Sequence, residues 1–102
     1  MLFTVIVGAD AERDWDEAVM WYEEREPEAC HRLNAAIRAV LHTLAHQPAR
    51  FSRATRLTHK AKVPPPWPYS IYFTVNVEHR EVKVQAIWHG ARNPAELRRL
   101  LK

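Results

Sequence analysis

Basic side chains gather in the second half of this 102-residue chain, at positions where they could act together. Lys60 and Lys62 alternate with apolar residues and would share one face of a strand. His89 and Arg92 follow another alternating run, where a strand meets a loop and function is common. Histidine exchanges protons near neutral pH, and lysine and arginine bind phosphates. Such a set suits binding of nucleic acid or of an acidic protein segment, and a proton shuttle beside cations is also what RNA cleavage needs.

The charge is divided unequally along the chain, although the net charge is only +3. Residues 1–28 hold nine acidic residues and two arginines, a net charge of −7. Residues 50–102 hold eleven lysines and arginines and three glutamates, a net charge of +8. The second half is therefore predicted to present a basic surface. The length predicts a single domain that spans residues 1–102. The alternative is therefore that the acidic and basic halves attract each other within this domain.

Alternating β-branched and aromatic residues predict the strands that must position these side chains. Residues 69–77 and 82–89 alternate apolar with polar positions around the polar break at 78–80, which predicts a β-hairpin. Residues 56–63 alternate in the same way, with Leu57 on the apolar face and Arg56 on the basic one. Together the three runs predict a three-stranded antiparallel meander.

Two helices are predicted upstream of the meander. Residues 11–22 place apolar side chains on one helical face and acids largely on the other, with Asp10 or Asp14 as the N-cap. Pro27 breaks this helix and opens a second one with a long apolar stripe. Because the link is so short, the two helices must form an antiparallel hairpin that covers one side of the sheet.

The two ends of the chain complete the predicted fold. Residues 2–7 form an apolar run, either a strand buried on both faces or one added to the later sheet. Asn93 and Pro94 predict the start of a short C-terminal helix. The fold class is therefore α+β, with a core predicted to contain Trp15, Tyr22, Leu33, Ile37, Leu41, Phe73, Val75, Val84 and Ala86.

These elements resemble the RelE/ParE toxin superfamily of bacterial type II toxin–antitoxin systems over about nine-tenths of the chain. The likeness rests on Pro68-Tyr69 before the hairpin, His89-x-x-Arg92-x-Pro94 after it, and Asp14, Ala18, Trp21 and Tyr22 in the first helix. It implies that the N-terminal strand completes a four-stranded sheet. It also implies a toxin whose cognate antitoxin lays an amphipathic, partly disordered segment against the sheet and helical pair. The single cysteine and the lack of a basic leader predict a cytoplasmic protein. The candidate binding surface comprises Arg56, Lys60, Lys62, His89, Arg92, Arg98 and Arg99.

The resemblance leaves two targets open. In RelE-like ribonucleases an arginine closes the last strand and paired lysines lie nearby, which Arg92, Lys60 and Lys62 would match, with His89 as proton shuttle. Those nucleases usually also carry an arginine where this chain has residues 69–71, and a tyrosine or histidine where it has residues 95–99. The pattern is closer to the ParE branch, which implies a toxin that binds and inhibits DNA gyrase. The alternative is a ribosome-dependent mRNA endoribonuclease, and an orphan structural member is a third interpretation.

Several residues also have structural explanations. His89 could hydrogen-bond a loop, and Arg92 could pair with Asp14 or Asp16. Lys60 and Lys62 could protect an edge strand from aggregation. The proline-rich residues 64–68 predict a stiff connector, which Trp67 would pin to the core.

No cofactor or metal is expected. Cys30 falls on the apolar stripe of the second helix and is predicted to be a core residue. His42 and His46 are one helical turn apart, but no third ligand lies close in the sequence. Residues 2–7 are far too few to span a membrane.

Overall fold

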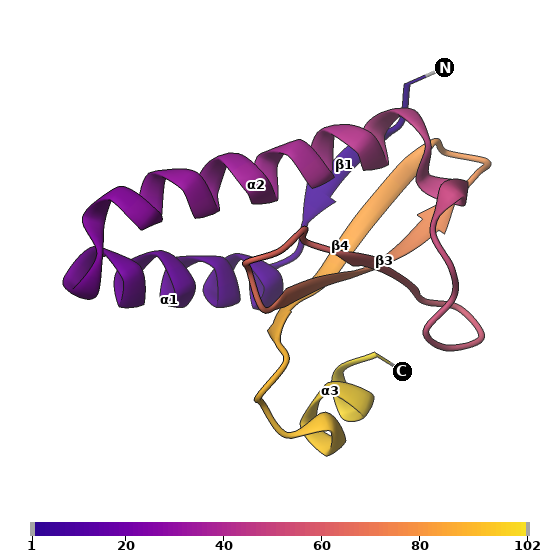
Figure 1. Ribbon diagram of the computed structural model, residues 1–102. Helices are drawn as coiled ribbons and strands as arrows, with labels where there is room; N and C mark the ends of the chain where they lie inside the picture. Colours follow the sequence, from indigo (N-terminus) through magenta and orange to yellow (C-terminus); the bar gives the residue numbers. More distant parts are fainter. Residues whose placement is uncertain (1, 102) are drawn as a thin grey trace.

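The computed structural model describes residues 2–101 and shows an α+β fold built on a four-stranded mixed sheet. Along the chain the elements are β1 (Thr4–Val7), α1 (Ala9–Arg25), α2 (Pro27–His46), a short 3-10 turn η1 (Pro48–Arg50), β2 (His59–Lys62), β3 (Tyr69–Asn76), β4 (Glu81–His89) and α3 (Pro94–Leu100). The strand order is β1-β4-β3-β2. Figure 1 shows α1 and α2 side by side as a hairpin, with α3 lying apart from them beyond the sheet.

The N-terminal strand joins the later sheet, which was one of the two predicted arrangements. β1 pairs in parallel with β4, whereas β2, β3 and β4 pair antiparallel, so the predicted meander is confirmed. β1 is an edge strand with no residue fully buried, so the prediction of a strand buried on both faces is wrong. Gly8 follows it, and its N–H donates to the Val84 carbonyl at 2.9 Å. A Cβ at Gly8 would lie 3.0 Å from that same oxygen, which explains the glycine.

The antiparallel helical hairpin is confirmed, but its first cap differs from the prediction. Helix α1 begins at Ala9 with Gly8 as the N-cap, and no side chain caps it. Asp10 therefore lies in the first turn rather than before it, because the chain enters the helix directly after Gly8. Pro27 opens α2, as predicted. Ala29 is buried in this helix, and so are all residues of the predicted apolar stripe except Leu41, namely Cys30, Leu33, Ile37, Val40 and Leu44.

The second strand is shorter than the sequence predicts. β2 contains only His59–Lys62, and Arg56 and Leu57 lie in the preceding bend. Leu57 is 66% exposed, so its predicted place on the apolar face is wrong. The physical reason is a local turn in which the Thr58 carbonyl accepts the N–H of Ala54 at 2.7 Å and that of Thr55 at 3.1 Å. Because the Thr58 carbonyl accepts these turn hydrogen bonds, it is not available for pairing with β3, and the strand begins only at His59.

The sheet is covered on both faces. One face packs against α1 and α2 through a core that includes Leu33, Ile37, Phe73 and Val84. The other face packs against α3, in a smaller cluster made of Tyr72, Ala86, Trp88, Leu97 and Leu101. Asn93 caps α3 as predicted, since its side-chain oxygen accepts the N–H of Ala95 at 2.9 Å. A bulge in the β3–β4 pairing leaves Gln85 without an opposite residue.

All nine predicted core residues contact these clusters, but to different extents. Five are buried: Leu33, Ile37, Phe73, Val84 and Ala86. Four are only partly buried: Trp15, Tyr22, Leu41 and Val75. Cys30 is 5% exposed, which confirms it as a core residue. Trp67 packs against the core with its ring centroid 5.5 Å from that of Tyr22, so it pins the proline-rich connector as predicted.

Candidate functional site

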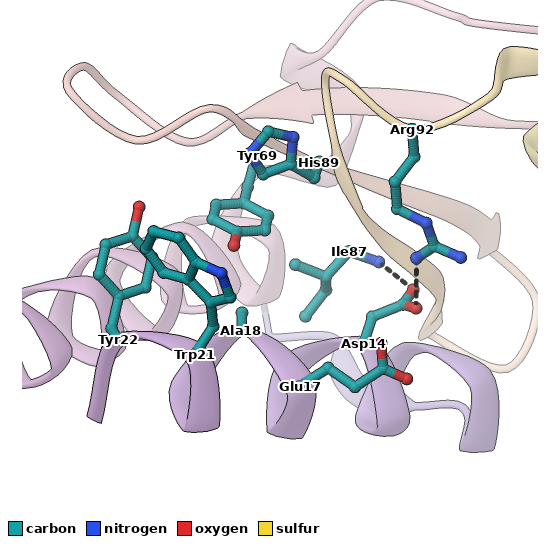
Figure 2. A pocket seen from close by; sticks show the side chains of 9 residues that line it. All are labelled: Asp14, Glu17, Ala18, Trp21, Tyr22, Tyr69, Ile87, His89 and Arg92. Atoms are coloured by element: carbon teal, nitrogen blue, oxygen red, sulfur yellow. Dashed lines mark hydrogen bonds and ion pairs between the residues drawn. The ribbon is translucent and has the colours of Figure 1, made fainter. Parts of the chain in front are cut away.

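A cavity of about 270 Å³ lies between α1 and the ends of β3 and β4. Helix α1 contributes side chains from three successive turns, and the strand ends and the following loop close the other side. Figure 2 shows the side chains that line it: Asp14, Glu17, Ala18, Trp21, Tyr22, Tyr69, Ile87, His89 and Arg92. The cavity thus joins one acidic helix to the closing histidine and arginine of the hairpin.

Asp14 fastens α1 to the sheet at one end of this cavity. Its side chain is 10% exposed. One carboxylate oxygen accepts the backbone N–H of Ile87 at 3.0 Å, and the other accepts from the Arg92 guanidinium at 3.0 Å (Figure 2). β1 ends at Val7, which pairs with Val84, so it does not reach Ile87. The Asp14 carboxylate therefore accepts the hydrogen bond of the Ile87 N–H, which lies in the part of β4 that β1 does not pair with.

Arg92 is held on three sides, and its predicted pairing with the first helix is confirmed at Asp14. Besides that bond, its guanidinium lies 3.7 Å from the ring centroid of Trp88, and Glu96 lies at 3.9 Å. Stacking on an indole and pairing with a carboxylate are both favourable for a guanidinium. Its side chain is still 39% exposed, so one part remains accessible to a partner.

His89 is also engaged within the molecule. Its Nδ1 accepts the backbone N–H of Ala91 at 2.9 Å, so the predicted loop hydrogen bond is confirmed. Its ring meets the Tyr69 ring edge to face, with centroids 5.2 Å apart. Since Nδ1 accepts a hydrogen bond, the proton of the neutral ring is on Nε2.

Burial shifts two acid–base equilibria in the cavity. The pKa of Asp14 is raised above its ordinary value of 3.8 mainly because the carboxyl is desolvated, and the nearby Glu17 adds to this. The Ile87 N–H and the Arg92 guanidinium pull the same pKa down without reversing the shift. The pKa of the Tyr69 phenol is raised above 10.0 by burial and by Tyr22. Tyr69 thus remains a neutral hydroxyl at pH 7.

The predicted basic residues do not form one surface. Lys60 and Lys62 pair with Tyr72 and Ser70, and paired residues share a face of the sheet. Since Tyr72 packs against α3, both lysines belong to the α3 side. His89 pairs with Tyr69, which lies in the core beneath α1 and α2, so His89 is on the opposite side.

The other three predicted site residues are exposed. Arg98 and Arg99 lie in the last turn of α3, while Leu97 of that helix is buried against the sheet. Arg56 lies in the bend before β2, with the guanidinium of Arg53 bonded to its carbonyl. Of the predicted basic residues, Lys60, Lys62, Arg98 and Arg99 therefore lie on the α3 side of the sheet, whereas only His89 and Arg92 line the cavity.

Sequence reasoning did not identify Glu17 or the aromatic walls as site residues. The signal was present: Asp14, Glu17, Ala18 and Trp21 follow the i, i+3, i+4, i+7 spacing of one helical face. This stripe lies beside the apolar stripe that the core prediction used. Because Asp14 and Glu17 are acidic, this stripe is interpreted from the sequence as solvent-exposed. In the structure the ends of β3 and β4 face it.

Within residues 2–101 no three His, Cys, Asp or Glu side chains come together in a way that could hold a metal ion. His42 and His46 are exposed on α2, with ring centroids 4.6 Å apart. In the same described part of the chain, no helix has the length and apolar character needed to cross a membrane.

Comparison with known proteins identifies relatives across most of the chain. Residues 5–94 match the family model described as the ParE toxin of the type II toxin–antitoxin system parDE. The protein named Toxin RelE1 from Caulobacter vibrioides is 33% identical over 91 residues, which cover 88% of this chain and 96% of that protein.

Solved structures share the fold at lower sequence identity. A chain of the chromosomal ParDE system of P. aeruginosa gives a TM-score of 0.72 at 16% identity, covering 86% of this chain and 96% of its own. The RelBE2 toxin–antitoxin complex of Mycobacterium tuberculosis gives 0.62 at 19% identity, with 87% and 99% covered. A mutant of E. coli toxin RelE in the free state gives 0.62 at 16% identity, with 99% and 100% covered.

Proposed function

The chain belongs to the ParE toxin family of type II toxin–antitoxin systems, and from this premise we propose that it inhibits DNA gyrase by binding it, without cutting RNA. The choice of gyrase is supported by the match to the ParE family model and by the closing His89-x-x-Arg92-x-Pro94 pattern, which resembles the ParE branch. Gyrase acts on the chromosome, so the proposal also implies that the toxin works in the cytoplasm.

The observation that carries this proposal is the separation of His89 from the paired lysines. Cleavage through the RNA 2′-hydroxyl needs a base, an acid and phosphate-binding cations around one phosphate. Here the histidine lies on the α1 side of the sheet, and Lys60 and Lys62 lie on the α3 side. Because the sheet stands between them, these groups cannot surround one scissile phosphate.

The state of Arg92 supports the same conclusion. A phosphate clamp needs a guanidinium whose donors are free to meet the transition state. One guanidinium nitrogen of Arg92 instead donates to Asp14, the group stacks on Trp88, and Glu96 lies 3.9 Å from another nitrogen, so two carboxylates compete with a phosphate for it. To bind a phosphate, Arg92 would have to leave Asp14. To bind a protein target it can stay in place, because its exposed part can contribute to a protein interface.

We propose a cognate antitoxin as the second partner. The ParDE and RelBE2 structures that share this fold come from systems or complexes that pair a toxin with an antitoxin. Co-expression of this chain with the adjacent reading frame should give a complex that survives gel filtration at low salt. Separate elution of the two proteins under those conditions would contradict this partner.

The alternative is a ribosome-dependent endoribonuclease acting on mRNA. It is favoured by the name of the relative from Caulobacter vibrioides and by the cations Lys60, Lys62, Arg98 and Arg99 on the α3 side. On that side Tyr72 is also present, with the Lys60 ammonium 5.9 Å from its ring. In this case catalysis would use the α3 side, and His89 would take no part.

One pair of assays separates the two mechanisms. Purified active toxin is added to a gyrase supercoiling reaction and, separately, to ribosomes carrying a defined mRNA. We expect supercoiling to stop and the mRNA to stay intact. Unhindered supercoiling with codon-phased cuts in the ribosome-bound mRNA would overturn the proposal. Arg92→Ala should weaken toxicity under either mechanism, so it does not discriminate between them.

A further inference from the structure

The cavity beside α1 is large enough for one long amino-acid side chain and small for a drug-sized ligand. Its volume of about 270 Å³ lies below the roughly 300–1,000 Å³ of pockets that hold drug-sized molecules. It would hold about nine waters at the roughly 30 Å³ each occupies in the liquid. A side chain from a protein partner therefore fits it better than a small-molecule substrate.

Aromatic rings form much of its wall. Trp21 is 49% exposed at the rim, and Tyr22 meets it edge to face with ring centroids 4.8 Å apart. Tyr69 closes the far side, and Figure 2 shows its hydroxyl directed toward α1. Rings of this kind attract cations through their faces, indole most strongly. The chain itself shows this at the rim, where the guanidinium of Arg25 lies 4.3 Å from the Trp21 centroid.

The charges that line the cavity favour a cation as well. Asp14 and Glu17 are acidic, and Arg92 is the opposing cation. Since Arg92 donates to Asp14 at 3.0 Å, Glu17 is left without an ion-pair partner among residues 2–101. An apolar guest would desolvate the Glu17 carboxylate without compensation, and an anionic guest would be repelled by it. The surrounding segment 1–28, with its net charge of −7, would draw a basic side chain toward the site.

We propose that this cavity accepts a single arginine or lysine side chain from the antitoxin, an assignment that rests on the antitoxin partner proposed above. Because Arg25 already covers one face of Trp21, the guest's cation would lie against the remaining aromatic surface of the cavity and pair with Glu17. The charge distribution in the sequence leads one to expect an antitoxin directed at the basic half of the toxin. The cavity adds a contact of opposite sign, which would fix the register of the antitoxin on α1.

The first test uses a simple probe on the full-length toxin. Acetyl-arginine amide is titrated into ¹⁵N-labelled protein while the Trp21 indole signal, assigned with Trp21→Phe, is followed by NMR. Acetyl-citrulline amide has nearly the same shape without the charge, and acetyl-leucine amide is the apolar probe. We expect saturable shifts with the arginine amide and affinity about fivefold above citrulline, as about 1 kcal/mol of cation–π and ion-pair energy implies.

Matched variants locate the effect. Glu17→Gln should weaken binding of the arginine amide about threefold or more, since roughly 0.7 kcal/mol of ion-pair energy is lost. Glu23→Gln removes another exposed acid of α1 that does not line the cavity, and it should leave the affinity unchanged. Equal binding of citrulline or leucine amide, absence of saturation, or equal loss in both variants would overturn the assignment.

The second test uses the antitoxin itself. Each of its basic residues is replaced by alanine, and affinity is measured against wild-type toxin and Glu17→Gln. One replacement should cost markedly more affinity with the wild type than with Glu17→Gln, which is the coupling a direct contact produces. Additive losses at every position would contradict the contact. The amide titration contains neither gyrase nor antitoxin, so its outcome is independent of whether the supercoiling assay succeeds.

Discussion

The guanidinium of Arg92 donates to the carboxylate of Asp14 at 3.0 Å across 78 positions of sequence. The same carboxylate accepts the N–H of Ile87, so one side chain joins α1, β4 and the loop after β4. This junction sets the distance between the helix and the strand ends, and with it the cavity between them. It also holds Arg92 in place, which adds to the separation of His89 from Lys60 and Lys62 as support for a toxin that binds its target without hydrolysis.

Removing this junction should destabilise the fold. Asp14→Ala leaves the Ile87 N–H without its acceptor and Arg92 without its closest partner. Loss of a partner to a buried donor typically costs about 1–3 kcal/mol of unfolding free energy. Urea denaturation of wild type and variant measures this loss.

Asp10→Ala is the matched control for that variant. Asp10 pairs with Arg13 at the same 3.0 Å, but both side chains are more than half exposed. An exposed pair contributes about 0–1 kcal/mol. If Asp10→Ala were as destabilising as Asp14→Ala, the junction would have no special role.

The raised pKa of Asp14 predicts a particular pH dependence of stability. Because the folded state holds this proton more tightly than the unfolded state, the group stabilises the fold fully below its unfolded pKa near 3.8. That contribution is lost as pH rises through the folded pKa. The stability of wild type minus that of Asp14→Asn should therefore fall as pH rises from about 3 toward neutrality.

A rise of this stability difference with pH would contradict the prediction. If the difference between wild type and Asp14→Asn grew with pH over this range, the Arg92 ion pair would outweigh burial and the folded pKa would be depressed. Asp10→Asn serves as the exposed control, and its difference from wild type should change little with pH.

The register of α2 can be checked with two identical substitutions. Leu44 is fully buried, whereas Leu41 is only partly buried against the core. Leu44→Ala should cost about 2–5 kcal/mol, as large-to-small core changes do, and Leu41→Ala should cost less than that. Equal losses in thermal or urea unfolding would mean that the stripe facing the sheet is centred differently.

Most of the fold could be predicted because periodicity and helix signals agree along the chain. The alternation in residues 69–77 and 82–89 places Phe73 and Val84 in the core, and Pro27 and Asn93 mark helix starts correctly. The error at Leu57 has a local cause. Alternation continued through that segment, but turn hydrogen bonds to Thr58 ended the strand.

The relation between the basic residues could not be predicted from alternation alone. Period two shows that Lys60 and Lys62 share a face, but not whether His89 shares it too. That depends on the register of β2 against β3 and of β3 against β4, including the bulge at Gln85. A slip of one residue moves every side chain of a strand to the other face. The cavity escaped prediction for a related reason, since its walls come from elements far apart in sequence.

Whether the toxin acts by binding gyrase is tested most directly by a titration of supercoiling activity. A fixed amount of purified gyrase is assayed for supercoiling with increasing amounts of active toxin, in a reaction that contains no RNA. A binding inhibitor should block supercoiling progressively as toxin occupies the enzyme, to near completion in excess, and antitoxin should restore the activity. Supercoiling that continues at the wild-type rate beside a large excess of toxin, shown to be active by its arrest of growing cells, would contradict the claim.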